Sequence, residues 1–370
     1  MIHFVVGTRA QIFKMAPVML ECQKRGLEWR WIYVAQHKET IKQTIDTFGL
    51  PNPDFTVVNR ETEADTPGKY GLWMMQAFWQ LLRTRRILAG YTGKKHIVLT
   101  HGDTTSTVWG ALLGRLGRCH VMHVESGLRS FNIFEPFPEE LNRLFTFRLA
   151  TVFATPGDWA ANNVRKYHGI KLNTRQNTQA DTIAFGIKNI HKINLDLPAG
   201  KYVVVTIHRY ENVFNKKRLG FIVAELEKIA EQFKVLFVCH PVTQIQLTKF
   251  GYDNFFKRNK NIEIYQRMEY LPFVKLITHA EFVITDGGGA QEELYQLGVP
   301  TLLFRNATER QEGINETAVI SKLDPEIIKD FVQNYIQYRK EPRILKDSPS
   351  QIIVDFLEDQ GFSSTSGRDI

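Results

Sequence analysis

Short apolar runs alternate with longer amphipathic stretches through the first half of the chain. The runs are rich in β-branched and aromatic residues, and they are too apolar for strands with one solvated face. The stretches between them, such as 14–26 and 106–117, carry apolar residues at helical spacing. This alternation is typical of a parallel sheet covered by helices. The predicted strands are 2–7, 28–34, 96–102, 120–125 and 151–156.

The alternation pauses at residues 169–201, where polar turns and a Pro-Ala-Gly break predict an interdomain connection. A second series of strands follows at 202–208, 234–240, 262–266, 281–287 and 301–305. The sequence therefore predicts an α/β protein with two doubly wound domains facing each other across a cleft. The expected boundaries are 1–172 for the first domain, 173–355 for the second, and 356–370 for an extension that completes the last helix and frays into a tail.

The composition fits this picture. The 370 residues are 43% hydrophobic and 23% charged, which is ordinary for a globular protein of two domains. Three scattered cysteines predict neither a zinc site nor disulfides, and they favour a reduced, cytoplasmic location. No apolar run approaches the ~18 residues of a membrane span, and the N-terminus does not resemble a signal peptide.

The formal net charge of +8 favours anionic ligands. No nucleic-acid-binding signature accompanies the charge, so we expect no nucleic-acid partner. A basic solvated surface explains the charge equally well, and a phosphorylated small molecule or an anionic membrane surface remains open as its target.

Open α/β sheets bind ligands beyond the carboxyl ends of their strands, so residues that directly follow strands are the first candidates. The first strand runs into Gly7-Thr8-Arg9 and a helix that carries Lys14. Helix-start amides and an arginine attract anions. The segment has neither the glycine pattern of a dinucleotide fold nor that of an ATPase P-loop, so no nicotinamide or other cofactor is predicted.

Three acids follow strands or begin helices of the first domain. Asp103 follows the strand at 96–102, Glu125 ends the strand at 120–125, and Glu139 lies four residues before Arg143. Helix capping explains Asp103 equally well, and a surface ion pair explains the last spacing. If the three acids converge on one site, their different environments shift their pKa values apart, so that one can act as an acid and another as a base. No nucleophilic elbow accompanies them, so proton abstraction fits better than acyl transfer.

The second domain carries the strongest single signal. Three glycines, Gly287 to Gly289, follow the strand at 281–287 and begin a helix, which is a ready cradle for a diphosphate. Glu292 and Glu293 lie further along this helix, within reach of a ribose. His208 ends the strand at 202–208, although a histidine there is also common in a purely structural role.

Together these segments resemble a known family. The chain is similar to bacterial UDP-N-acetylglucosamine 2-epimerases of the non-hydrolysing type in GTRAQIFKMAPV, HGDTTST, HVESGLRS, PFPEELNR, TIHRYEN, ITDGGGAQEE and RNATERQEG, in that order. The resemblance implies a GT-B fold of two Rossmann-like domains with a cleft between them. It also implies interconversion of UDP-GlcNAc and UDP-ManNAc by anti elimination of UDP through 2-acetamidoglucal, without a cofactor or metal.

The resemblance also implies roles for individual residues. Asp103, Glu125 and Glu139 match the acids implicated in proton transfer, and Arg143 stands beside them. The residues that match diphosphate-binding positions are Arg9, His208, Gly288 and Gly289, of which His208 also assists the departure of UDP. Lys14 matches a lysine of the same cleft, Glu293 matches the ribose-binding acid, and Phe273 falls near the uracil. Which acid serves as base stays open.

The chain departs from the family pattern at several positions. The usual GTRPE is Gly7-Thr8-Arg9-Ala10-Gln11, a serine is replaced by Gly287, and an arginine is replaced by Tyr210. Some family members have a second, regulatory UDP-GlcNAc site, and the matching candidates here are Gln36, His37, Arg209, Glu211 and His240. Tyr210 argues against that regulation. The substrate is therefore UDP-GlcNAc or a related UDP-HexNAc.

Other functions remain open. A hydrolysing epimerase would release free sugar and UDP. A GT-B glycosyltransferase would share the nucleotide cradle but would not need three acids from the first domain, and a non-catalytic binding protein would tolerate their loss. The resemblance also implies a homodimer.

Overall fold

The computed structural model describes residues 1–34, 41–58, 67–89, 95–133, 138–252, 256, 258–308, 310–343 and 346–362. The chain forms two compact units. Unit 1 comprises Met1–Thr182 and Leu345–Ile370, and unit 2 comprises Ile183–Ile344. None of the described helices is long and apolar enough to cross a membrane.

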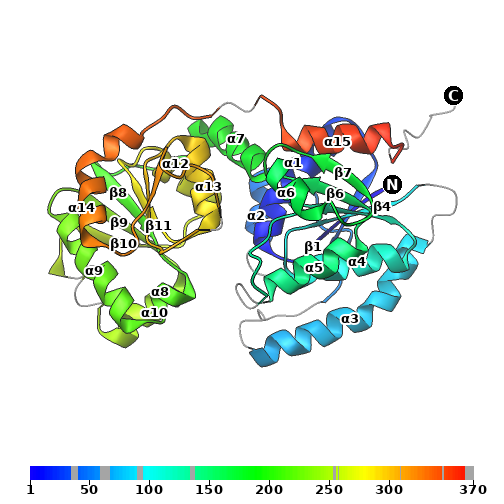
Figure 1. Cartoon of the computed structure of the whole chain (residues 1–370), viewed down its shortest axis with the longest axis horizontal. Coiled ribbons are helices and arrows are strands. Elements are labelled where there is room, and N and C mark those ends of the chain that lie inside the picture. The colour runs from blue at the N-terminus through cyan, green and yellow to red at the C-terminus, as the bar shows by residue number, and fades with distance from the viewer. Residues whose placement is uncertain are drawn as a thin grey trace. The chain divides into compact units, whose positions relative to one another are not determined.

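Unit 1 is built on a seven-stranded parallel sheet with the order β3-β2-β1-β4-β5-β6-β7 (Figure 1). Helices α3, α4 and α5 cover one face, and α1, α2 and α15 lie on the other. The elements are β1 (Ile2–Val6), α1 (Arg9–Lys24), β2 (Trp29–Tyr33), α2 (Ile41–Phe48), β3 (Phe55–Thr56), α3 (Pro67–Ala89), β4 (Ile97–His101), α4 (Thr105–Leu116), β5 (His120–Val124), α5 (Glu139–Leu149), β6 (Val152–Thr155), α6 (Asp158–Val164), β7 (Ile170–Asn173), α7 (Gln179–Asn189) and α15 (Pro349–Asp359).

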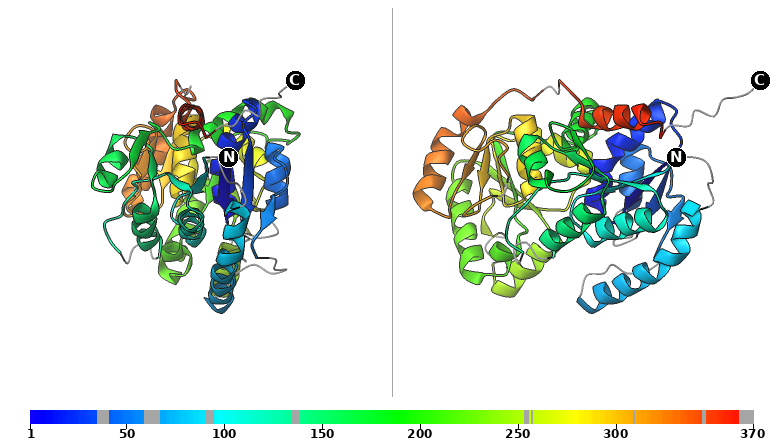
Figure 2. Two further views of the ribbon diagram at one scale, coloured as in Figure 1. Left: turned by 90° about the vertical axis from the view of Figure 1, so that its right-hand side faces the viewer. Right: turned by 45° about the vertical axis from the view of Figure 1, so that its right-hand side comes forward.

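Unit 2 repeats the plan with a six-stranded parallel sheet of order β10-β9-β8-β11-β12-β13 (Figure 2). Its elements are η1 (Ile190–Lys192), β8 (Tyr202–Thr206), α8 (Tyr210–Val213), α9 (Lys216–Ala230), β9 (Lys234–Cys239), α10 (Pro241–Phe250), β10 (Ile262–Gln266), α12 (Tyr270–Thr278), β11 (Val283–Thr285), α13 (Gly288–Leu297), β12 (Thr301–Leu303), β13 (Ala318–Ile320), α14 (Pro325–Asn334) and η2 (Tyr335–Tyr338).

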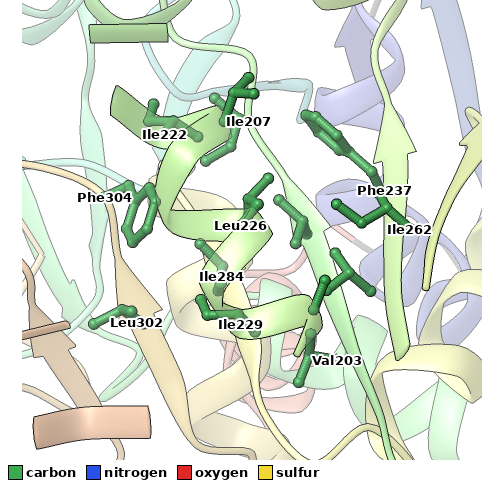
Figure 3. Packing of buried hydrophobic residues seen from close by; sticks show 14 of the residues in the cluster. Val203, Ile207, Ile222, Leu226, Ile229, Phe237, Ile262, Ile284, Leu302 and Phe304 are labelled. Carbon is green, nitrogen blue, oxygen red and sulfur yellow. The ribbon is translucent and has the colours of Figure 1, made fainter. Parts of the chain in front are cut away.

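The core of unit 2 shows why the apolar runs become strands. Inward side chains of β8, β9, β11 and β12 pack against the apolar stripe of α9 (Figure 3). Leu226 and Ile229, three residues apart on that stripe, are buried together with Ile284 and Leu302 of the sheet. Strands covered on both faces are uniformly apolar, and this explains why they were predictable from the sequence.

The predicted doubly wound architecture is confirmed, and each of the ten predicted strands corresponds to a strand of the structure. The interdomain connection differs from the prediction. Residues 170–173 form β7, an edge strand with exposed and half-buried side chains that gives little apolar signal. The units divide at Thr182, within α7, and not at residue 172, and the chain returns to unit 1 near residue 345. Residues 363–370, the expected tail, lie outside the described part.

Each sheet has one point at which the strand order reverses, between β1 and β4 in unit 1 and between β8 and β11 in unit 2. Connections leave these neighbouring strands toward opposite faces of the sheet, so an opening forms beyond their carboxyl ends. The segments that follow β1 and β4 carry Arg9 and Asp103, and those that follow β8 and β11 carry His208 and Gly288. The fold thus places the predicted site residues where such sheets bind ligands.

Candidate active site

In unit 1, the Glu125 carboxylate is held by two nitrogen-bearing side chains. Lys14 Nζ of α1 donates to both Glu125 oxygens, at 3.1 and 2.9 Å. His101 Nε2, at the end of β4, lies 2.9 Å from Glu125 Oε2, and all three side chains are largely buried. Two of the predicted residues therefore meet directly, and His101 joins them.

The backbone around Glu125 is unusual. Glu125 has φ +62°, in the left-handed region that costs a non-glycine residue about 1 kcal/mol or more. Gly127 also has a positive φ, and a Cβ there would overlap the carbonyl oxygen of Ala160. The turn after β5 is thus tight, and its glycine is required by close packing.

Arg143 connects two acids of the first unit. Its guanidinium donates to Asp103 Oδ2 at 2.5 Å and to Glu140 Oε2 at 3.1 Å. Burial opposes the charge of Arg143, but Asp103 and Glu140 outweigh burial and raise its pKa. The Asp103 side chain remains 29% exposed, so this carboxylate is fixed in place and still accessible.

Glu140 was not among the predicted site residues. Its carboxylate is fully buried and accepts hydrogen bonds from Arg129 Nε, from the Ser130 amide and from Arg143. Burial favours the neutral form of Glu140, but these three donors outweigh burial and lower its pKa. The only sequence signal was a second glutamate directly after Glu139.

The expected pairing of Glu139 with Arg143 is not the one found. Arg143 pairs with Glu140, three residues before it, and with Asp103. Glu139 is the first residue of α5, and its Oε2 is buried with no hydrogen-bond partner among the described residues.

His123 braces the loops that carry these acids. Its Nε2 bonds the Gly102 carbonyl at 2.7 Å and its Nδ1 lies 2.9 Å from Ser126 Oγ. Because a carbonyl can only accept, Nε2 carries the proton and Nδ1 accepts from the hydroxyl. Complete burial lowers the pKa of His123 to about 4, so the ring is neutral at pH 7.

Gln11 fixes the loop that carries Arg9. Its side-chain oxygen accepts from the Gly7 amide at 2.8 Å and from the Thr8 amide at 3.2 Å. Its Nε2 donates to the carbonyl of His101 at 2.7 Å, which ties the end of β1 to the end of β4. The Gln11 amide supplies both the acceptor and the donor that this loop uses. The replacement of the family's acid by Gln11 is therefore consistent with the structure of the loop. Arg9 lies over the ring of Phe13, at 5.1 Å.

In unit 2, the segment after β8 is organised by Asp286, which follows β11. The fully buried carboxylate accepts from the amides of His208 and Arg209, both at 3.0 Å, and from the Asn212 side chain at 2.9 Å. His208 Nδ1 lies 3.4 Å from the same carboxylate, and its ring is half exposed. Asp286 thus positions the predicted His208.

The helix α13 begins at Gly288 and has no side-chain cap at Gly287. The first amides of an α-helix have no partner within the helix, so Gly288 and Gly289 offer N–H groups to an anion. Gly289 has open space around its Cα. At Gly287, by contrast, a Cβ would lie 3.0 Å from His208 Cε1. Because Gly287 lacks the serine side chain of the family pattern, the His208 ring can lie close to its backbone.

The two acids of α13 differ in their surroundings. Glu292 is buried and forms an ion pair with Arg310 at 2.5 Å. Glu293 lies close enough to Tyr270 to add to the effect of burial, which raises the pKa of that phenol well above its usual value. Phe273 lies on the same helix as Tyr270, α12, and is half-buried. The ion pair gives Glu292 a structural role, which Glu293 does not share.

The sequence model of the UDP-N-acetylglucosamine 2-epimerase family matches residues 20–350. The chain belongs to this family. The UDP-N-acetylglucosamine 2-epimerase of Methanocaldococcus jannaschii is 32% identical over 334 residues, which cover 86% of this chain and 87% of that protein. The enzyme of the same name from Bacillus subtilis is 29% identical over 349 residues, 91% of this chain and 88% of that protein.

Two solved structures extend the comparison. The crystal structure of the Methanocaldococcus jannaschii UDP-GlcNAc 2-epimerase in complex with UDP-GlcNAc and UDP gives a TM-score of 0.77 at 28% identity, covering 97% of this chain and 99% of that one. The Neisseria meningitidis UDP-GlcNAc 2-epimerase bound to UDP-GlcNAc gives 0.78 at 25% identity, with the same coverage. The predicted family membership and GT-B-like fold are thus confirmed.

The residues that match the family's regulatory site are described only in part. Gln36 and His37 lie outside the described residues. Arg209 and Glu211 lie 3.6 Å apart as an ion pair, and the ring of His240 is 6.1 Å from that of His208. These three residues surround the start of α8, next to the predicted diphosphate position.

Proposed function

We propose that this member of the UDP-N-acetylglucosamine 2-epimerase family interconverts UDP-GlcNAc and UDP-ManNAc, or a closely related UDP-HexNAc pair. Family membership and the two similar epimerases with bound UDP-GlcNAc support the substrate. The observation that carries the chemistry is the set of three carboxylates in unit 1, each in a different environment.

The proposed reaction balances without a cofactor. A carboxylate takes the C2 proton, a double bond forms between C1 and C2, and the C1–O bond breaks, with the electron pair leaving on UDP. UDP then adds back to C1 of 2-acetamidoglucal while C2 receives a proton on the opposite face. Inversion at C2 therefore requires two proton-carrying groups, and neutralisation of the leaving diphosphate lowers the barrier.

We assign removal of the C2 proton from UDP-GlcNAc to Glu139. Its buried Oε2 has no hydrogen-bond partner among the described residues, so a lone pair is available to accept a proton. Asp103, by contrast, is bonded to Arg143. Its part is to fix Arg143 and to contact the substrate rather than to carry the proton.

The second proton is assigned to Glu125 and His101. Their Oε2 and Nε2 atoms are 2.9 Å apart, so His101 fixes the position of the Glu125 carboxyl group. Lys14 contacts both carboxylate oxygens and stabilises the anion that remains after Glu125 has given its proton to C2.

UDP is bound by unit 2 in this proposal. The amides of Gly288 and Gly289 and the side chain of His208 receive the diphosphate, and Glu293 accepts from the ribose hydroxyls. Glu293→Ala should weaken UDP binding about 10-fold, the scale of one charge-assisted hydrogen bond. Isothermal titration with UDP measures this, with the exposed Glu231→Ala as a control. Unchanged affinity would remove Glu293 from the ribose site.

The decisive experiment follows UDP-GlcNAc in D2O by NMR. The wild type should give UDP-ManNAc with deuterium at C2. Glu139→Gln should turn over ~10²-fold more slowly or worse, as expected for a general base, while its affinity for UDP changes less than ~3-fold. Asp46→Asn, an exposed change on α2, serves as the control.

Three outcomes would contradict the proposal. Product without deuterium at C2 would exclude elimination with solvent exchange. Free sugar together with UDP would indicate a hydrolysing epimerase. Full activity of the Glu139, Glu125 and Asp103 amide variants would raise the glycosyltransferase alternative.

Two wider inferences complete the proposal. The three cysteines are buried free thiols, which fits a reducing compartment and supports a cytoplasmic location. The family resemblance supports a homodimer.

A further inference from the structure

The segment between β5 and α5 contains a phenylalanine in a backbone conformation that disfavours it. Phe131 has φ +59°, in the left-handed region. Bulky residues are rare there, because the Cβ lies too close to the following carbonyl oxygen, and glycine or asparagine is the usual choice. Core packing does not compensate for the strain, since Phe131 is 67% exposed. Stability alone therefore does not explain a phenylalanine at this position.

Hydrogen bonds on both sides hold the strained residue in place. The Ser130 amide donates to Glu140 Oε2 at 3.1 Å, and the Ser130 hydroxyl donates to the Asn132 carbonyl at 3.0 Å. The Asn132 amide in turn donates to Ser130 Oγ at 3.3 Å. Strained conformations persist where the surrounding structure fixes them, and they gather at ligand sites. The backbone at Phe131 is fixed in this way.

The ring of Phe131 is attached to the ion-pair network of the candidate active site. The Arg129 guanidinium lies 4.9 Å from the centroid of the ring, and its Nε donates to the buried Glu140 carboxylate. Glu140 also accepts from Arg143, which holds Asp103. Three side chains therefore connect the exposed ring to one of the predicted acids.

The place of Phe131 in the chain indicates which part of a substrate it meets. Phe131 lies between Glu125, which directly follows β5, and Glu139, the first residue of α5. In the proposed reaction both of these acids act at C2 of the hexose. The acetamido group is bonded to this carbon, and its methyl group is the only methyl group of GlcNAc. It is therefore the part of the sugar nearest the acids that an exposed aromatic ring can bind.

We propose that Phe131 is a specificity-determining residue that packs against the acetamido group of the UDP-HexNAc substrate. Contact with the ring removes the methyl group from water, whereas a hydroxyl group at C2 would lose its hydrogen bonds to water there. This inference rests on the epimerase function proposed above. It assigns the residue that distinguishes an N-acetylated sugar from one with a hydroxyl group at C2.

The variant Phe131→Gly separates recognition from folding. Glycine adopts φ +59° without strain, so the variant should melt no lower than the wild type. Loss of the ring should raise the KM for UDP-GlcNAc at least ~5-fold, the scale of one apolar group returned to water. The inhibition constant of UDP-glucose, which has a hydroxyl group at C2, should change less than ~2-fold. Phe131→Tyr keeps the ring and should have the KM of the wild type within ~2-fold.

Arg118→Gly is the matched control. Arg118 is exposed, has φ +56° and lies before β5, at the end of the strand opposite to the acids. Its replacement relieves the same kind of strain, so the melting temperature should again not fall. The KM for UDP-GlcNAc and the inhibition constant of UDP-glucose should both equal those of the wild type.

Three results would overturn the assignment. An unchanged KM for UDP-GlcNAc in Phe131→Gly would exclude the contact. Equal weakening of UDP-GlcNAc and UDP-glucose would mean that the ring does not read the acetamido group. A variant that melts below the wild type and loses affinity for both would give Phe131 a structural role.

The product formed in D2O keeps the two proposals apart. A wild type that gives no deuterated UDP-ManNAc would contradict the epimerase function and this assignment with it. A wild type that gives the deuterated product, together with a Phe131→Gly variant of unchanged KM, would contradict the assignment of Phe131 alone.

Discussion

Replacing either of two adjacent glutamates at the start of α5 by glutamine should affect a different property of the protein. Glu140→Gln removes a fully buried carboxylate that accepts from Arg129, Ser130 and Arg143. A glutamine keeps one acceptor oxygen but turns an NH2 group toward donors. Glu139→Gln changes a carboxylate with no hydrogen-bond partner at its buried oxygen among the described residues. We expect the first change to affect stability and the second to affect turnover.

The magnitude follows from the burial of Glu140. Removing one partner of a buried ion pair costs about 3–5 kcal/mol, because the other charge stays buried and uncompensated. In a unit of about 200 residues, 1 kcal/mol moves the melting temperature by about 2–4 °C. Glu140→Gln should therefore lower the transition of unit 1 by ~10 °C. Glu139→Gln should shift it by less than ~2 °C.

Calorimetry at several pH values provides the assay. The pKa of Glu140 is lowered in the folded protein from an ordinary value of 4.5, so its contribution is fully present above pH 4.5. The difference between wild type and Glu140→Gln should shrink as the pH falls below 4.5 and the carboxylate takes up a proton. A Glu140→Gln protein that melts with the wild type at pH 7, or a Glu139→Gln protein that melts as low as Glu140→Gln, would refute this reasoning.

Three further outcomes are expected. Gly127→Ala should cost unit 1 more than ~3 kcal/mol in a denaturant titration, because its Cβ would overlap the Ala160 carbonyl. His123→Gln should remove a pH dependence of stability. In the wild type, between pH 6.5 and about 4, His123 takes up a proton only in the unfolded state. The free energy of unfolding of the wild type should therefore fall by ~3 kcal/mol over this range, at 1.36 kcal/mol per pH unit. Asp286→Asn should destabilise unit 2 by ~2 kcal/mol and weaken UDP binding, measured by titration, because the turn at His208 loses a charged acceptor.

Much of the fold was predictable because the strands are covered on both faces. Continuous apolar runs such as 202–208 have few interpretations in a chain that also contains amphipathic helices. The edge strand β7 and the short β13 lack such runs, since their side chains are partly exposed. The return of α15 to unit 1 depends on contacts between distant segments, such as the ion pairs of Arg25 with Asp355 and Glu358. No local pattern reports these.

The sequence predicted which strand ends carry the candidate site. It did not predict which of the side chains there bond to one another. Asp103, Glu125 and His208 all lie just after the carboxyl ends of strands, as the sequence predicted. The choice of Glu140 over Glu139 as the partner of Arg143 depends on the side-chain direction at the first turn of α5, which spacing does not decide. Asp286 was not among the predicted site residues, and its role appears only when β8 and β11 pair.

The strained backbone at Glu125 separates what that residue does for folding from what it does for chemistry. At φ +62°, glycine is about 1 kcal/mol more favourable than a residue with a Cβ, so stability alone would select glycine. Glutamate directs its carboxylate to Lys14 and His101 from this position. Glu125→Gly and Glu125→Ala both remove that carboxylate and should be equally inactive. Their stabilities should nevertheless differ, with the glycine variant more stable by about 1 kcal/mol in thermal denaturation, since only alanine retains the strain. Equal stabilities would mean that the turn relaxes once the ion pair is lost, and that the carboxylate itself holds the backbone in this conformation.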